Sequence, residues 1–171
     1  SGFNHDPTIS PLHGARMAAA VLTAGRLMEP SIVDRFVDSE GEILYQWSPV
    51  SAKQAMSSEA SSILNQLMQT TISSGTSRKS FRGYRRDSIL SHLQIGGKTG
   101  SINNRTHDQR FDWFVGFAKG RQGESKLAIA VVVAHQGYIG CRASRYARMA
   151  MKYYFQNYLA SNDQDLPDQD N

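Results

Sequence analysis

Three stretches of strand-forming residues follow one another in the second half of the chain, and they constrain its fold more than any other feature. Gln94 to Thr99 is followed by an aromatic and β-branched run, Phe111 to Ala118, and then by an apolar run, Leu127 to Ala134. Such runs, separated by polar turns, are typical of β-strands. Because strands joined by short turns pair with their sequence neighbours, the sequence predicts a three-stranded antiparallel meander.

Helical and hairpin segments precede the predicted meander. An alanine-rich stretch, Leu12 to Leu27, follows a serine–proline pair that suits a helix start, and this helix is expected to end around Gly25. Two short β-leaning runs, Ile32 to Val37 and Ile43 to Trp47, then predict a small β-hairpin.

Two further helices complete the predicted fold. Ser57 can cap a helix whose apolar residues recur at helical spacing as far as Gly75. Arg142 to Leu159 predicts an amphipathic closing helix laid across the sheet. The chain is therefore assigned to the α+β class, with helices flanking an antiparallel sheet.

Size and composition exclude several classes of protein. With 171 residues, of which 40% are hydrophobic, the chain is long enough for one domain with a real core. No apolar run approaches the roughly 18 residues of a membrane span. The single Cys141 excludes an internal disulfide framework, and the five histidines lack the spacing of metal ligands. Neither a metal nor a cofactor is predicted.

Charge is concentrated in one segment and in the tail. The net charge is +4, and Arg78 to Arg86 carries five basic and no acidic residues, which leaves −1 for the rest of the chain. With Phe81 and Tyr84 interleaved, the segment could bind nucleic acid. A solvated loop or a docking surface for anions is favoured instead, since nothing else here resembles a nucleic-acid-binding fold. The last eleven residues, 161–171, hold four aspartates and predict a disordered acidic tail after a domain at 1–160.

The segment Ile95 to Ser101, "IGGKTGS", allows three interpretations. A phosphate-binding loop of the G-x-x-x-x-G-K-[ST] type would need a glycine where this chain has His92, and a helix after the lysine where a strand is predicted. The nucleotide-loop interpretation is therefore disfavoured. A hairpin with an incidental Lys-Thr-Gly, or the Lys-Thr-Gly strand motif of penicillin-recognising serine enzymes, remains open.

Five pieces in order carry a family resemblance over roughly Ser1 to Leu159. They are "SGF…TISPLHGARMAAAVLTAGRLMEP", "MQTTISSGTSRKS", "IGGKTGS", "FDWFVGFA" and the final strand and helix. In these pieces the chain resembles the C-terminal half of the transpeptidase domain of a high-molecular-weight penicillin-binding protein. That resemblance implies the fold shared by penicillin-binding proteins and serine β-lactamases.

The resemblance implies roles for four consecutive residues. Lys98 would place an ammonium group near the reacting serine and support proton transfer. Thr99 and Ser101 would offer hydroxyl groups to the terminal carboxylate of the substrate, and the backbone N–H of Ser101 would be one of two oxyanion donors. Gly100 would let an extended peptide lie close to the strand. A plainer interpretation is that Lys98 is an exposed lysine whose charge keeps the sheet edge from pairing with another chain.

Two motifs of the family are not found. A Ser-x-x-Lys motif needs a serine three positions before a lysine. Before the six lysines of this chain, that position holds Val50, Thr76, Ile95, Gly116, Gly123 and Met149, so the motif is not found. Ser101-Ile102-Asn103 spells Ser-x-Asn, but it directly follows Lys-Thr-Gly and cannot lie across the cleft from it. In the family both motifs lie upstream. The chain is therefore expected to be half of a domain and inactive by itself.

The resemblance also implies a function, partners and a location. The parent protein would be a serine-type D-Ala-D-Ala transpeptidase that cross-links peptidoglycan stem peptides and is acylated by β-lactams. It would act on the periplasmic side of the inner membrane, anchored by a segment outside this chain. Other expected partners are the N-terminal half of the same domain and a second copy of the chain, but not nucleic acid. The alternatives are a non-catalytic peptide-binding module and a β-lactamase or penicillin sensor.

Overall fold

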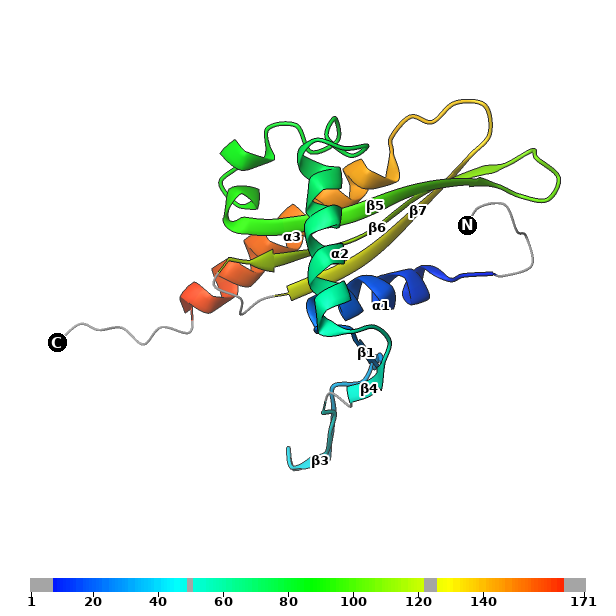
Figure 1. The fold of residues 1–171 in the computed structure, drawn as a ribbon. Coiled ribbons are helices and arrows are strands. Elements are labelled where there is room, and N and C mark those ends of the chain that lie inside the picture. The colour runs from blue at the N-terminus through cyan, green and yellow to red at the C-terminus, as the bar shows by residue number, and fades with distance from the viewer. Residues whose placement is uncertain (1–7, 49–50, 122–125, 165–171) are drawn as a thin grey trace.

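A three-stranded antiparallel sheet is the centre of the computed structural model (Figure 1). The structure describes residues 8–48, 51–121 and 126–164. The strands are β5 (Leu93–Asn103), β6 (Arg110–Gly120) and β7 (Lys126–His135), in the order β5-β6-β7. Each pairs with its sequence neighbour in an unbroken antiparallel register. The predicted meander is confirmed, and β5 and β6 are each longer than the segments predicted for them.

Helices cover the two faces of this sheet. Val115 on β6 lies against Gly14 of α1 (Pro11–Leu22), where an added Cβ would be 3.1 Å from the valine methyl. Asp112 lies three residues earlier on β6, and its carboxylate accepts a hydrogen bond from the N–H of Ala143, the first residue of α3 (Ala143–Gln164). Because strand side chains alternate between faces, residues 112 and 115 point to opposite sides. The helices α1 and α3 therefore lie on opposite faces of the sheet.

The main hydrophobic core lies between the sheet and α3. Phe114 of β6 is fully buried, and its ring centre lies 6.0 Å from that of Phe81, in the loop after α2. The buried cluster comprises Ile72, Phe81, Leu90, Leu93, Ile95, Phe114, Ala118, Ala143, Ala147, Met151 and Phe155. Two short 3-10 turns, η1 (Tyr84–Arg86) and η2 (Leu90–His92), complete the loop that leads into β5.

The first helix is shorter than predicted. It ends at Leu22, and the chain then adopts positive φ angles at Ala24 (55°) and Gly25 (85°). A Cβ at position 25 would lie 2.1 Å from the carbonyl oxygen of Met56, so only glycine fits this turn. Leu27 therefore belongs not to the helix but to a three-residue strand that the sequence analysis did not predict.

That strand, β1 (Arg26–Met28), pairs antiparallel with β4 (Ser51–Gln54). Between them the chain forms the predicted hairpin of β2 (Arg35–Val37) and β3 (Ile43–Gln46), which points away from the body of the molecule (Figure 1). The prediction of the hairpin is confirmed.

The other two helices also begin where the sequence indicates. Ser57 caps α2 (Ser58–Ser73) by accepting a hydrogen bond from the N–H of Ala60. The closing helix α3 runs on to Gln164, five residues past the predicted end, and so includes the first residues of the expected tail. The remainder of that tail, 165–171, lies outside the described residues. None of the helices described here is both long and apolar enough to cross a membrane.

Candidate active site

The two glycines before Lys98 make room for aromatic rings of the neighbouring strand. A Cβ at Gly96 would lie 2.4 Å from the ring of Phe117, and a Cβ at Gly97 would lie 2.2 Å from the ring of Phe114. Both rings are fully buried. The glycines are thus required by packing inside β5, and β6 follows them instead of a helix. The phosphate-loop interpretation does not fit this geometry.

Lys98 is exposed on the outermost strand of the described sheet. Its Nζ donates a hydrogen bond of 2.8 Å to the carbonyl oxygen of Thr99, and it forms no ion pair within the described ranges. Thr99 and Ser101 point to one face of β5, whereas Lys98 and Gly100 point to the other. The structure therefore brings the two hydroxyl groups together and separates them from the ammonium group by the strand itself.

Thr99 is held by a residue that the sequence analysis did not assign to the site. Its Oγ1 lies 2.8 Å from Oγ1 of Thr76, just after α2. Thr76 is exposed, so this hydroxyl pair remains open to solvent. The only sequence signal for Thr76 was its place in the turn that ends the helix, which gives no indication of a contact with β5.

Ser101 contacts a buried carboxylate that the sequence analysis also missed. Its Oγ donates a long hydrogen bond of 3.5 Å to Oδ1 of Asp112, which is only 4% exposed. The same Oδ1 accepts a bond from Arg142, and Oδ2 accepts one of 2.8 Å from the N–H of Ala143. Asp112 thus joins Ser101 to the start of α3. A lone acid within the apolar run "FDWFVGFA" was the signal available for it.

The outer edge of β5 is open around Gly100. Of the described strands, only β6 pairs with β5, so the other edge has no strand neighbour. A Cβ at Gly100 would meet nothing closer than the Cβ of Trp113, at 3.6 Å. On an edge strand, the backbone N–H and C=O groups that face away from the partner strand have no partner in the sheet. An extended peptide could therefore pair with this edge of β5.

These residues supply binding groups and charge but no activated nucleophile. An ammonium group, two hydroxyl groups and unpaired strand backbone can bind and polarise a carbonyl or a carboxylate. No Ser-x-x-Lys occurs in the 171 residues, and the Ser-x-Asn at Ser101 to Asn103 lies on the same strand as Lys98. Across the described ranges, no group of three His, Cys, Asp or Glu side chains is placed to hold a metal ion.

Comparison with known sequences identifies a family over most of the chain. Residues 2–152 match the model of the penicillin binding protein transpeptidase domain. The chain is 30% identical over 112 residues to penicillin-binding protein 1A of Neisseria lactamica, covering 63% of this chain and 13% of that protein. It is 31% identical over 109 residues to penicillin-binding protein 1B of Haemophilus influenzae, covering 64% and 12%. The chain thus spans about an eighth of the length of these relatives.

Solved structures share the fold at lower sequence identity. The imipenem acyl-enzyme of penicillin-binding protein A from M. tuberculosis aligns with a TM-score of 0.71 and 22% identity, over 88% of this chain and 32% of that one. The D,D-transpeptidase domain of a peptidoglycan glycosyltransferase from Eggerthella lenta aligns with a TM-score of 0.70 and 22% identity, over 89% and 33%. The described α+β fold is therefore that of transpeptidase domains, as predicted.

Proposed function

The chain belongs to the family of penicillin binding protein transpeptidase domains. We propose that Lys98 to Ser101 form one side of an acyl-serine site, which we call the Lys-Thr-Gly wall, and that this site cross-links peptidoglycan stem peptides. The observation that carries this proposal is the open outer edge of β5, where Lys98, Gly100 and Ser101 are exposed together. This edge suits a substrate that is itself an extended peptide.

Each residue of the wall has a role in this proposal. The peptide lies along the edge of β5, and Gly100 allows its backbone to approach closely. Thr99 and Ser101, which share a face, bind the terminal carboxylate through their hydroxyl groups. The N–H of Ser101 donates to the developing oxyanion, and Lys98 stabilises negative charge in the cleft. Asp112 is a positioning residue, because it holds the Ser101 side chain against the start of α3.

The nucleophile in this proposal comes from a segment outside these 171 residues. Covalent catalysis by serine needs a base within hydrogen-bond reach of the nucleophile, about 2.6–3.2 Å. No Ser-x-x-Lys in the chain could supply that pair. The exposed apolar residues of α2, which are Ile63, Leu64 and Leu67, offer a surface for the other part of the domain. The chain alone is then inactive, and the longer protein that contains it acts outside the cytoplasmic membrane.

Labelling with a fluorescent penicillin tests whether the longer protein is an enzyme. We expect one covalent label per molecule, stable over minutes, because the acyl-enzyme forms through an activated serine. A non-catalytic peptide-binding module would take up no label. A β-lactamase would take up label and release it rapidly with hydrolysis of the drug. Either of these two results would contradict the proposed transpeptidase.

The isolated 171-residue chain is expected to self-associate. Several apolar residues of α1 and α2 are exposed, including Leu12 (58%) and Leu67 (59%), and burying them against a second copy removes apolar area from water. Sedimentation of the chain at increasing concentration should show a dimer or a larger species. A monomer at every concentration would count against this expectation, and so would a dimer that survives Leu12→Ser and Leu67→Ser together.

A further inference from the structure

A basic groove runs along the loop after α2 and the start of α3. It consists of a central hollow of about 670 Å³ and two outer hollows of about 480 and 520 Å³, each of which shares lining residues with the central one. Its cationic lining residues are Arg78, Lys79, Arg82, Arg85, Arg86, Arg121, Arg142, Arg145 and Arg148. No described acidic residue lines any of the three hollows. We call this surface the basic groove.

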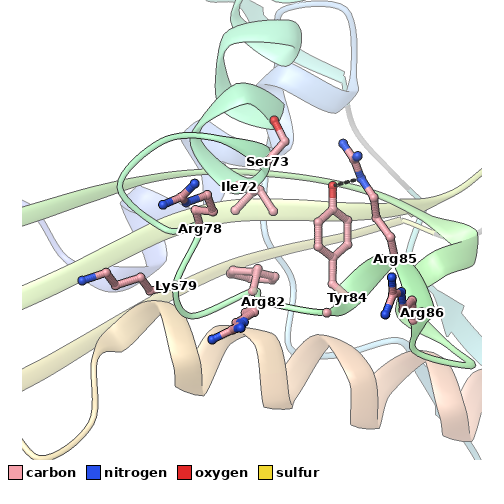
Figure 2. A pocket seen from close by; sticks show the side chains of 10 residues that line it. Ile72, Ser73, Arg78, Lys79, Arg82, Tyr84, Arg85 and Arg86 are labelled. Atoms are coloured by element: carbon pink, nitrogen blue, oxygen red, sulfur yellow. Dashed lines mark hydrogen bonds between the residues drawn. The ribbon is translucent and has the colours of Figure 1, made fainter.

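The central cations of the groove have no acidic partner among the described residues. Figure 2 shows Arg78 and Lys79 at one end of the central hollow and Arg85 and Arg86 at the other, with Arg82 between them. All five side chains are exposed, and none forms an ion pair with another described residue. Like charges gathered in one hollow repel each other, so their arrangement favours an anionic ligand.

The nearest acid in the sequence, Asp87, is already engaged. Its Oδ2 lies 2.9 Å from Nζ of Lys152, and its Oδ1 accepts hydrogen bonds from the N–H groups of Ile89 and Leu90. Partial burial raises the pKa of Asp87, but these hydrogen bonds outweigh burial and hold the pKa below its ordinary value. Asp87 therefore remains bound to α3 and does not neutralise the arginines.

The loop that carries the arginines is anchored to the body of the protein. The guanidinium of Arg148 on α3 donates hydrogen bonds of 3.1 and 3.0 Å to the carbonyl oxygens of Ser80 and Arg82. Between them, Phe81 inserts its ring into the core and is 1% exposed. These contacts fix the backbone of the loop before any ligand arrives, so less order has to be created on binding.

The aromatic residues of the loop do not suit a nucleic-acid ligand. Single-stranded nucleic acids stack their bases on exposed rings. Phe81 is buried, and Tyr84 is half-buried with its ring at right angles to that of Phe81 and the guanidinium of Arg85 placed over it. The hydroxyl of Tyr84 also accepts a hydrogen bond from Arg85 (Figure 2). The Phe81 ring is out of reach of a base and Arg85 lies over a face of the Tyr84 ring, so the interleaved aromatics of the sequence do not form a platform of exposed rings.

The shape and polar lining of the groove suit an extended peptide. A membrane surface is flat, whereas these residues line connected hollows. Exposed amide and hydroxyl side chains of α2, namely those of Gln66, Thr70 and Ser73, line the hollow next to the arginines. They can hydrogen-bond a peptide backbone, while guanidinium groups bind carboxylates in a bidentate manner.

We propose that the basic groove binds an acidic peptide segment of a partner protein, whose carboxylates pair with Arg78, Arg82 and Arg86. This interaction surface is separate from the Lys-Thr-Gly wall, and its use does not depend on the proposed transpeptidase activity. Arg78, Arg82 and Arg86 are not among the residues assigned to the site on β5, although Arg142 at one end of the groove also bonds Asp112.

Fluorescence anisotropy with labelled decaglutamate tests the proposal on the full chain. The test variant combines Arg78→Gln, Arg82→Gln and Arg86→Gln, whose side chains make no hydrogen bond within the described ranges. The matched control combines Arg26→Gln, Arg35→Gln and Arg110→Gln. These three arginines are exposed and lie outside the groove, and their replacement gives the control the same net charge as the test variant. We expect the test variant to bind about tenfold more weakly and the control to bind like the unaltered chain, because three exposed charge contacts are lost only in the former.

Several results would overturn the proposal. Equal affinity of the two triple variants would show that decaglutamate responds to net charge and not to the groove. Equal binding of labelled decaglutamine would exclude carboxylate recognition. Tighter binding of a decanucleotide, or of phosphatidylglycerol vesicles, through the same three arginines would assign the groove to nucleic acid or to a membrane surface instead.

Discussion

Replacing Lys98 by alanine in the longer protein is expected to slow acylation by penicillin about 100- to 1,000-fold, the usual effect of removing one group that stabilises transition-state charge. The fold should be retained. The Lys98 side chain is exposed, and its single hydrogen bond within the described chain goes to the carbonyl of the adjacent Thr99. Stopped-flow or gel-based labelling gives the rate, and circular dichroism monitors the fold.

Lys126→Ala is the matched control for this experiment. Lys126 is also an exposed strand lysine, but it begins β7, at the other edge of the described sheet. If Lys98 only protected a sheet edge, both variants would acylate at the unaltered rate, and both would show a greater tendency to aggregate. Loss of acylation in Lys98→Ala alone is the result that the proposed site requires.

Gly97→Ala is expected to lower the free energy of unfolding of the 171-residue chain by about 3 kcal/mol, at the upper end of the usual cost of overpacking. The new methyl group would lie 2.2 Å from the Phe114 ring. That ring is fully buried and packs against Phe81, so it has no space to move into. Urea unfolding followed by tryptophan fluorescence measures the change.

Gly100→Ala provides the control on the same strand. Its new methyl group would be 3.6 Å from the nearest side-chain atom, an ordinary contact, so the free energy of unfolding should change little. In the longer protein the same methyl group would project at the edge where the peptide is proposed to lie. Equal destabilisation by both substitutions would mean that Gly97 does not have the packing role described here.

The sheet and most helices could be predicted because their signals are local. Strand-forming runs, turn residues and a capping serine such as Ser57 act within a few residues of themselves. The pairing of β1 with β4 could not be predicted, because the partners are short and lie more than twenty residues apart in the chain. The true end of α1 depends on Gly25 meeting Met56, which is a tertiary contact.

The sequence motif of the candidate site could be predicted, but the contacts that its residues make with other elements could not. The sequence "IGGKTGS" identified β5, but it could not indicate that the two glycines accommodate Phe117 and Phe114. The contacts of Thr99 with Thr76 and of Ser101 with Asp112 join separate elements. The basic segment was visible in the sequence, whereas the burial of Phe81 emerged only from the fold.

Intact-mass analysis after penicillin treatment, with peptide mapping of the adduct, shows directly whether the nucleophilic serine lies inside or outside this chain. We expect one adduct on the longer protein, on the serine of a Ser-x-x-Lys outside residues 1–171, and no adduct on the 171-residue chain alone. An adduct on any serine within residues 1–171, in either sample, would overturn the proposed site. The nucleophile would then lie in this chain, and "IGGKTGS" would not face a serine supplied by another segment.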